Sequence, residues 1–247
     1  MISKTHTKDI KELHHKKFRD EYGLFIAEGP KVVLDLLEEG KFLCKELFTV
    51  NNWLDDYSGL PAIDAETTIY QIQDFELEKI SALATPNKVL GVFKKQEIIG
   101  SVEPDGKITL LLETIQDPGN LGTIIRTADW FGIKNIICSE DCVEMYNPKL
   151  VQGTMGSLGR VNIKYTALAS FMSEHKHIKT YACTLRGQPV AELGRVIEGM
   201  IIIGNESRGI SGNLLKLADN QVTVPKKGKA ESLNAAVATG IILSRVI

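Results

Sequence analysis

The stretch that decides the fold is residues 108–139, ITLLLETIQDPGNLGTIIRTADWFGIKNIICS. An apolar run leads into a polar turn that contains proline and glycine. Apolar residues at helical spacing follow, and a second apolar run ends the stretch. This pattern predicts a buried strand, a helix over residues 119–131 and another strand. Short apolar strands joined by helices are typical of a parallel sheet with both faces covered.

The same alternation continues to the C-terminus. We expect six strands, at residues 108–113, 135–139, 161–165, 180–184, 200–204 and 222–224. The helices expected after the first one cover residues 148–158, 168–175, 212–218 and 232–246. Together these elements predict an α/β domain with a parallel sheet over residues 108–247.

A weaker alternation precedes this domain. Residues 1–21 indicate one basic amphipathic helix, strands are expected at 24–27, 47–50 and 89–93, and helices at Pro30 and Asp74. This pattern predicts a small α/β domain over residues 1–95. Residues 96–107 are polar and rich in turn-forming residues, so we interpret them as a linker.

Composition sets broad limits on function. With 29 basic and 31 acidic residues the net charge is −2, which neither indicates nor excludes an RNA partner. Residues 1–20 lack the apolar core of a signal peptide, and no apolar run approaches the roughly 20 residues of a membrane span. The four scattered cysteines suit reduced thiols. We therefore expect a cytoplasmic protein.

Ligands of parallel α/β sheets bind at the carboxyl ends of the strands, and three loops at these ends are unusual. The first contains Asn120 and leads into a helix carrying Arg126, which lies about 200° around the helix from the buried Ile124. Arg126 therefore points away from the apolar face, as a solvated helix arginine would. It also lies near the start of the helix, where the backbone N–H groups favour an anion, so a role in binding is the alternative.

The second loop, residues 204–209, reads GNESRG and follows an apolar strand. Its glycines permit close approach of a ligand, although a plain polar turn would look similar. The third loop, residues 224–234, contains three lysines and leads into the last helix, for which Ser232 is a natural N-cap.

Common nucleotide-binding and hydrolytic motifs are absent from the sequence. Residues 153–159 do not follow the G-x-G-x-x-G spacing, and no P-loop occurs. None of the five histidines falls in the three loops, which argues against a histidine base, a Ser-His-Asp triad or a histidine-containing metal site there.

Taken together, the three loops resemble the three motifs of the SpoU/TrmH family of RNA 2′-O-ribose methyltransferases, in the SPOUT superfamily. The matching segments are Asn120-Leu121-Gly122 with Arg126, Ile203-Gly204-Asn205-Glu206, and Pro225 with Ser232-Leu233-Asn234. Residues 16–29 also resemble, more loosely, the L30e-like RNA-binding domain that precedes the catalytic domain in related enzymes.

The resemblance implies a deep C-terminal trefoil knot, a homodimer with its active site near the two-fold interface, and S-adenosylmethionine as cofactor, with no metal. It places the cofactor against Thr184, Leu185, Gly204, Asn205, Val224, Pro225 and Leu233. It assigns catalysis to Arg126, supported by Asn120, Glu206, Ser232 and Asn234. Because arginine keeps its proton in proteins, Arg126 suits charge stabilisation better than the role of base.

The implied substrate is structured RNA, with ribosomal RNA favoured over transfer RNA and guanosine as the favoured nucleoside. Lysines in the third loop depart from the family pattern, and they suit either RNA contact or a solvated face. Candidate RNA-binding residues are Lys16, Lys17, Arg19, Lys226, Lys227 and Lys229. A catalytically silent RNA-binding relative and a small-molecule methyltransferase are the alternatives.

Overall fold

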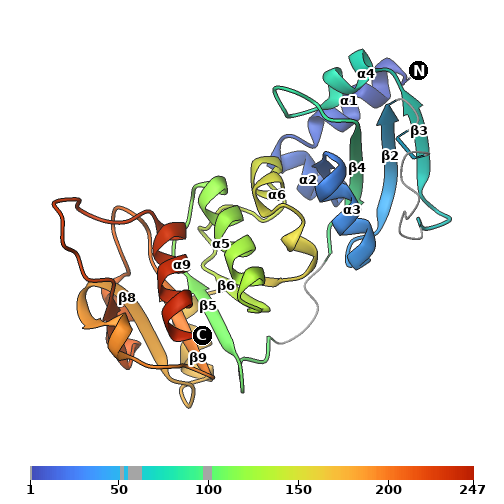
Figure 1. The fold of residues 1–247 in the computed structure, drawn as a ribbon. Helices are drawn as coiled ribbons and strands as arrows, with labels where there is room; N and C mark the ends of the chain where they lie inside the picture. Colours follow the sequence, from blue (N-terminus) through green and yellow to red (C-terminus); the bar gives the residue numbers. More distant parts are fainter. Residues whose placement is uncertain (1, 51–52, 55–62, 97–101) are drawn as a thin grey trace. The chain divides into compact units, whose positions relative to one another are not determined.

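A computed structural model describes residues 2–50, 53–54, 63–96 and 102–247. The chain divides into two compact units: unit 1 comprises residues 1–97 and 145–160, and unit 2 comprises residues 98–144 and 161–247 (Figure 1). Residues 97–101, inside the expected linker, lie outside the described residues. Among the described helices, none is long and apolar enough to cross a membrane.

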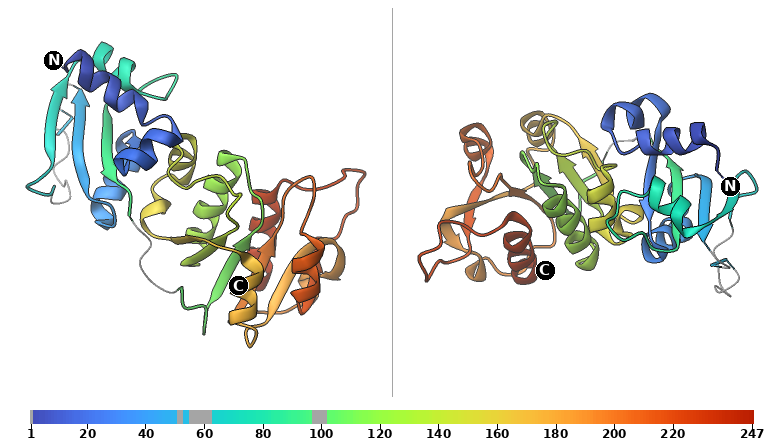
Figure 2. Two further views of the ribbon diagram at one scale, coloured as in Figure 1. Left: turned by 180° about the vertical axis from the view of Figure 1, so that it is seen from behind. Right: turned by 90° about the horizontal axis from the view of Figure 1, so that it is seen from above.

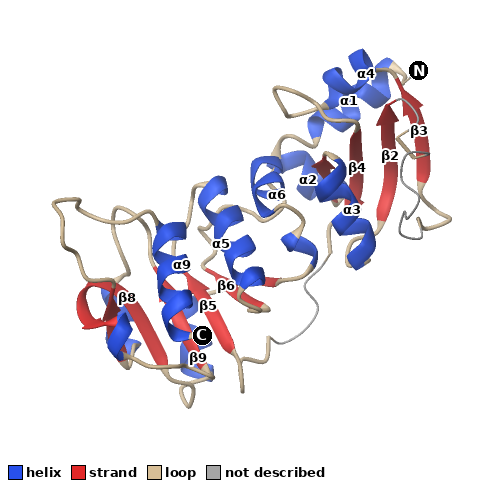
Figure 3. Cartoon of the chain, in the orientation of Figure 1, coloured by secondary structure: helices blue, strands red, loops and turns tan. Residues whose placement is uncertain are grey.

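Unit 1 contains a sheet with the strand order β1-β4-β2-β3 among its described residues (Figure 3). The strands are β1 (Leu24–Glu28), β2 (Cys44–Val50), β3 (Thr68–Ile72) and β4 (Val89–Lys94). β4 is antiparallel to both β1 and β2, whereas β3 is parallel to β2. The sequence pattern did not predict β3, because this edge strand is largely exposed and carries little apolar signal.

Between residues 2 and 96, the described part of unit 1 contains the helices α1 (Lys4–Glu12), α2 (Lys16–Tyr22), α3 (Pro30–Glu39) and α4 (Asp74–Ile80). The prediction of one helix over residues 1–21 was wrong, since α1 and α2 are separate. The carbonyl of Leu13 accepts a hydrogen bond from the Arg19 guanidinium at 2.8 Å. This side-chain bond takes the place of an intrahelical partner, so the chain turns between the two helices.

The segment 145–160 lies between the two sequence segments of unit 2 but packs within unit 1. Its helix α6 (Pro148–Thr154) is followed by the short 3₁₀ helix η1 (Ser157–Gly159), so the helix expected over 148–158 ends early, at the left-handed Met155. Tyr146 packs on Phe25 with 4.7 Å between ring centroids. Arg160 pairs with the buried Asp35 at 3.1 Å.

Unit 2 is built on the parallel sheet that the sequence predicts. Over residues 102–247 the strand order is β10-β8-β9-β5-β6-β7, and each neighbouring pair is parallel. The strands are β5 (Ile108–Leu112), β6 (Asn135–Cys138), β7 (Asn162–Tyr165), β8 (Thr180–Pro189), β9 (Gly199–Ile203) and β10 (Asn220–Thr223). The predicted fold class is therefore confirmed.

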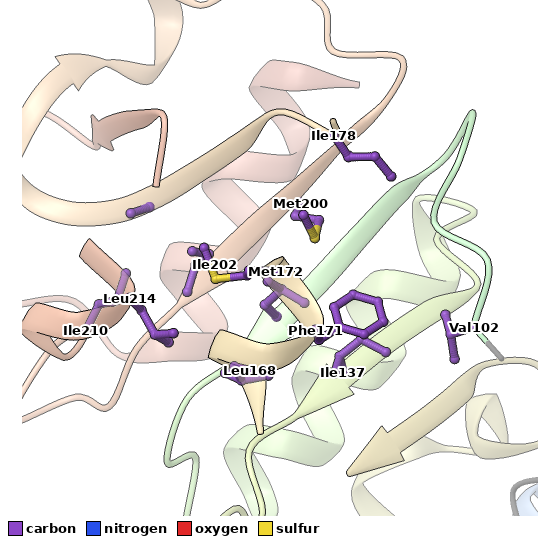
Figure 4. Packing of buried hydrophobic residues seen from close by; sticks show 12 residues of the cluster. Val102, Ile137, Leu168, Phe171, Met172, Ile178, Met200, Ile202, Ile210 and Leu214 are labelled. Atoms are coloured by element: carbon purple, nitrogen blue, oxygen red, sulfur yellow. The ribbon is translucent and has the colours of Figure 1, made fainter. Parts of the chain in front are cut away.

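Helices cover both faces of this sheet (Figures 1 and 2). On one face lie α7 (Leu168–Glu174) and α8 (Gly212–Leu217), and Figure 4 shows Phe171, Met172 and Leu214 packed against strand residues. On the other face α5 (Pro118–Trp130) packs beside α9 (Ala235–Val246). These buried contacts hold the strand ends, and the loops that follow them, in fixed positions.

Two local features of unit 2 differ from the sequence prediction. The last helix starts at Ala235 with Asn234 as its N-cap, whose side chain accepts hydrogen bonds from two backbone amides, so Ser232 is not the cap. β8 is longer than expected and its register with β10 jumps: Gln221 pairs with Ala182, and the next residue, Val222, pairs with Gln188. Residues 183–187 therefore leave the ladder.

Candidate active site

The three unusual loops meet at one edge of the unit 2 sheet. They follow β5, β9 and β10, and parallel strands present their carboxyl ends on the same side. β5 and β9 are direct neighbours, while β8 separates β9 from β10. Residues far apart in the sequence are thus brought together there.

A chain of hydrogen bonds joins the three loops through their amide and carboxylate side chains. Nδ2 of Asn234 donates to Oδ1 of Asn120 at 2.8 Å, and Nδ2 of Asn120 donates to Oε1 of Glu206 at 2.5 Å. The Glu206 carboxylate can only accept a hydrogen bond, so the Asn120 amide group must donate to it. The Asn120 oxygen then faces Asn234 and accepts from it. Asn234 uses its own oxygen to cap α9, so its amide group is left to donate.

Backbone crowding fixes the shape of the second loop. Asn205 and Gly209 form an antiparallel bridge, with the Asn205 nitrogen 3.2 Å from the Gly209 oxygen. A Cβ atom on Gly204 would lie 2.5 Å from the Gly209 carbonyl, too close for any side chain. Glycine at 204 is therefore required by the way the loop folds back on itself.

A pocket of about 700 Å³ opens beside this loop. Its wall includes residues 183–186, which lie where β8 leaves its ladder with β10, together with residues of the second and third loops. Seven residues proposed from the sequence line it: Thr184, Leu185, Gly204, Asn205, Val224, Pro225 and Leu233. Glu206, Ser232, Lys226 and Lys227 line it as well.

The pocket has the size and chemistry for an adenosyl cofactor. Small-molecule sites typically measure about 300–1,000 Å³ and combine apolar walls with a few polar groups. Leu185 is 73% exposed although it lies in the pocket wall, as expected of an apolar side chain that a ligand would cover. Gly204 lets a ligand approach the backbone closely. The residues that line the pocket therefore fit an adenosyl cofactor.

Arg126 is exposed on α5 and is not among the described residues that line the pocket. It follows Asn120 by six positions, or about 9 Å along a helix axis. The structure therefore joins Asn120, Glu206 and Asn234 directly but does not place Arg126 with them.

The basic residues proposed for RNA binding have different environments. Lys16 and Lys17 are exposed on α2, and Lys226, Lys227 and Lys229 are exposed on the third loop. Arg19 is 2% exposed and bonded to the Leu13 carbonyl, which gives it a structural role in place of the expected phosphate contact.

Sequence reasoning missed two groups near the site. Arg186 and Arg208 also line the pocket, but charged residues in loops carry no distinctive pattern. The Thr114 carbonyl accepts a hydrogen bond from Asn205 in the second loop, and Asp141 accepts one from the Thr114 hydroxyl. The feature that distinguishes this pair from ordinary loop residues is the left-handed backbone of Thr114, which has a φ of 56°. That angle is not visible in the sequence.

Comparison with known proteins agrees with this geometry. Residues 107–244 match the SpoU rRNA Methylase family, and residues 4–91 match the MRM3-like substrate binding domain. The chain is 32% identical over 241 residues to the 23S rRNA (guanosine(2553)-2′-O)-methyltransferase RlmP of Bacillus subtilis, covering 96% of this chain and 93% of that protein.

Solved structures show the same fold. The AdoMet-bound rRNA methyltransferase from Sinorhizobium meliloti superposes with a TM-score of 0.87 at 29% identity, covering 99% of this chain and 95% of that one. A TrmH-family protein from Porphyromonas gingivalis gives a TM-score of 0.85 at 31% identity, covering 99% and 98%.

Fold, pocket and relatives define a methyltransferase whose cofactor is S-adenosylmethionine. The chain belongs to the SpoU rRNA methylase family. It is accordingly an RNA 2′-O-ribose methyltransferase.

Proposed function

We propose that this enzyme methylates the ribose 2′-hydroxyl of a guanosine in ribosomal RNA. The observation that carries the proposal is the match, across both halves of the chain, to an enzyme named for that reaction. The Asn234–Asn120–Glu206 chain beside a pocket of suitable size supports it.

In this proposal the cofactor lies against Thr184, Leu185, Gly204, Asn205, Val224, Pro225 and Leu233. Bound S-adenosylmethionine supplies an electrophilic methyl group. Glu206 and Ser232 line the same pocket and offer an acceptor and a hydroxyl to the incoming ribose. Asn120 and Asn234 hold Glu206 in place.

Arg126 stabilises negative charge at the ribose oxygen or at the adjacent phosphate. Its guanidinium keeps its proton, so it provides electrostatic stabilisation and does not act as the base. We propose that it acts on the pocket of a second copy, since it does not line the pocket of its own chain in the described residues. The site is then complete only in a homodimer.

The surface near α5 and α9 supports such a dimer. Trp130 on α5 is 86% exposed, Val237 on α9 is 52% exposed, and Leu233 just before α9 is 43% exposed. Large exposed apolar side chains are typical of surfaces that bind a protein partner. We also retain, as part of the proposal, a knotted path for the C-terminal segment.

A heterodimer experiment tests the shared site. Arg126→Ala is combined with Gly204→Ala, a variant designed to lose cofactor binding, and mixed dimers are purified with two affinity tags. If Arg126 acts across the interface, the mixed dimer regains about half the wild-type activity. An inactive mixed dimer, with both parents folded, would show that Arg126 acts within its own chain.

Residues 1–95 are proposed as the substrate-binding domain, 96–107 as the linker and 108–247 as the catalytic domain. Exposed Lys16 and Lys17, with the lysines of the third loop, supply contacts to RNA phosphates. Mapping of ribose methylation in ribosomal and transfer RNA from cells lacking the gene tests the substrate. Loss of one guanosine methylation in ribosomal RNA is expected; a site lost in transfer RNA instead would overturn the assignment.

A further inference from the structure

Thr114, two residues after the end of β5, has an unusual backbone conformation. Its φ is 56°, in the left-handed region. For a β-branched residue this region is a genuine outlier, because the side chain crowds the backbone. A strained conformation of this kind persists only where surrounding contacts hold it.

Two residues of the loop after β6 hold Thr114 in place. The Thr114 amide donates to Oγ of Ser139 at 2.8 Å, and its hydroxyl donates to Oδ2 of Asp141 at 2.7 Å. The other carboxylate oxygen of Asp141 accepts from the Ser139 hydroxyl at 2.5 Å. The three side chains therefore form a closed set of bonds, and the bond from Ser139 holds the pKa of Asp141 below its usual range.

The carbonyl of Thr114 in turn holds the second loop. It accepts a hydrogen bond from Nδ2 of Asn205 at 2.9 Å. With the amide nitrogen fixed in this way, Oδ1 of Asn205 accepts from the backbone amides of Ser207 and Arg208 at 2.9 and 3.1 Å. These bonds shape the turn that forms one wall of the cofactor pocket and carries Glu206.

We propose that Thr114 and Asp141 are positioning residues for the cofactor pocket, acting through Asn205. Among the described residues, neither Thr114 nor Asp141 lines the pocket. Asp141 offsets the strain of the left-handed Thr114, and the strained backbone aims the Thr114 carbonyl at Asn205. The inference concerns the methyl-donor pocket and does not depend on which RNA is methylated.

Three substitutions of Thr114 distinguish the effect of its backbone strain on cofactor binding from the effect of its hydroxyl group. Thr114→Val keeps the β-branch but loses the hydroxyl, so we expect S-adenosylmethionine to bind at least tenfold more weakly in calorimetric titration. Thr114→Ser keeps the hydroxyl and should bind within about threefold of wild type. Thr114→Gly adopts positive φ without help, so it should also bind within about threefold.

Asp141→Ala, made in the wild-type and in the Thr114→Gly background, tests whether Asp141 acts on cofactor binding through Thr114. In the wild-type background it should weaken cofactor binding about as much as Thr114→Val does. In the Thr114→Gly background it should have little further effect, because no strain remains for Asp141 to offset. Kinetically, KM for the cofactor should rise in Thr114→Val, while KM for RNA and kcat at saturating cofactor should stay near wild type.

Thr7→Val is the control for loss of a threonine hydroxyl, since the Thr7 hydroxyl donates to the Ser3 carbonyl in unit 1, away from the pocket. Thermal unfolding of each cofactor-free variant establishes that it folds. The proposal is overturned if Thr114→Val binds the cofactor as wild type does, or if Thr114→Gly binds as weakly as Thr114→Val. An Asp141→Ala effect of equal size in both backgrounds would also overturn it.

Discussion

The side-chain amide of Asn120 donates to the Glu206 carboxylate at 2.5 Å, although 86 positions separate the two residues in the chain. The bond joins the start of α5 to the loop after β9. Asn120 also accepts from Asn234 at the start of α9. One amide thus connects three separate segments of the site.

Replacing this amide by a carboxylate should disrupt the site. In Asn120→Asp two carboxylates face each other where a donor met an acceptor, so we expect the free energy of unfolding to fall by about 1–3 kcal/mol at pH 7.5. Much of the loss should recover near pH 5, where one carboxyl binds a proton. Urea unfolding at both pH values measures this, and Asn162→Asp, at an exposed position of β7, is the control.

Gly204→Ala should damage the pocket without altering any functional group. The new methyl group would meet the Gly209 and Ile210 backbone at 2.5–2.6 Å, so the loop must move. Overpacking of this kind costs about 1–3 kcal/mol of stability, and the displaced loop should lose affinity for S-adenosylmethionine. Gly212→Ala, where a Cβ meets open space, should bind the cofactor normally; equal affinity in the two variants would contradict the expectation.

Trp130→Ala should weaken the proposed dimer. Tryptophans at the centre of interfaces commonly contribute about 2 kcal/mol or more, so the dimer dissociation constant should rise by roughly thirtyfold or more. Sedimentation equilibrium measures the change, and activity should return at high protein concentration. Ile197→Ala removes a side chain that is 81% exposed elsewhere in unit 2 and should leave dimerisation unchanged.

The Tyr146 hydroxyl should matter for the stability of unit 1. It accepts from the Gln96 amide at 3.0 Å and donates to the Gln96 carbonyl at 3.1 Å. Tyr146→Phe removes this partner from the exposed Gln96 backbone, so unfolding of unit 1 should become easier by about 0.5–1.5 kcal/mol. The exposed Tyr22 hydroxyl bonds only to Glu12 among the described residues, and Tyr22→Phe should have little effect.

Burial lowers the pKa of Lys41 to about 8, from an ordinary value of 10.5. Between these values the unfolded chain binds more protons than the folded chain, so this lysine makes stability rise with pH. We expect the stability difference between wild type and Lys41→Met to shift in favour of wild type from pH 7.5 to pH 9.5. Guanidinium unfolding at both pH values would show no such shift if Lys41 titrates normally when folded.

The pattern of apolar runs predicted the parallel sheet well. Strands such as β5 and β9 are buried on both faces, so they appear in the sequence as short uninterrupted apolar segments. β3 was missed because its side chains are mostly exposed. The break between α1 and α2 was missed because local periodicity does not reveal the hydrogen bond between the Leu13 carbonyl and the Arg19 side chain, six positions later.

The three loops were found because they follow strands, and strand ends can be recognised locally. The resemblance to the SpoU/TrmH family then assigned the candidate pocket residues in and near these loops. Asp141 and Ser139 also follow a strand, but nothing in their spacing indicates a bond to Thr114. The same applies to residues 145–160, which the sequence pattern assigned to the α/β domain over residues 108–247 and which pack with unit 1.

By itself, the sequence determined the order of strands and α-helices after residue 107, the fold class, and the three loops at which chemistry was expected. These properties depend on local periodicity and on turn-forming residues, which the chain carries wherever it folds. Only the tertiary structure decided that Asn234 donates to Asn120, that Thr114 supports Asn205 and that Arg126 lies outside its own pocket lining. Such relations depend on the packing of distant segments, and no short stretch of sequence encodes them.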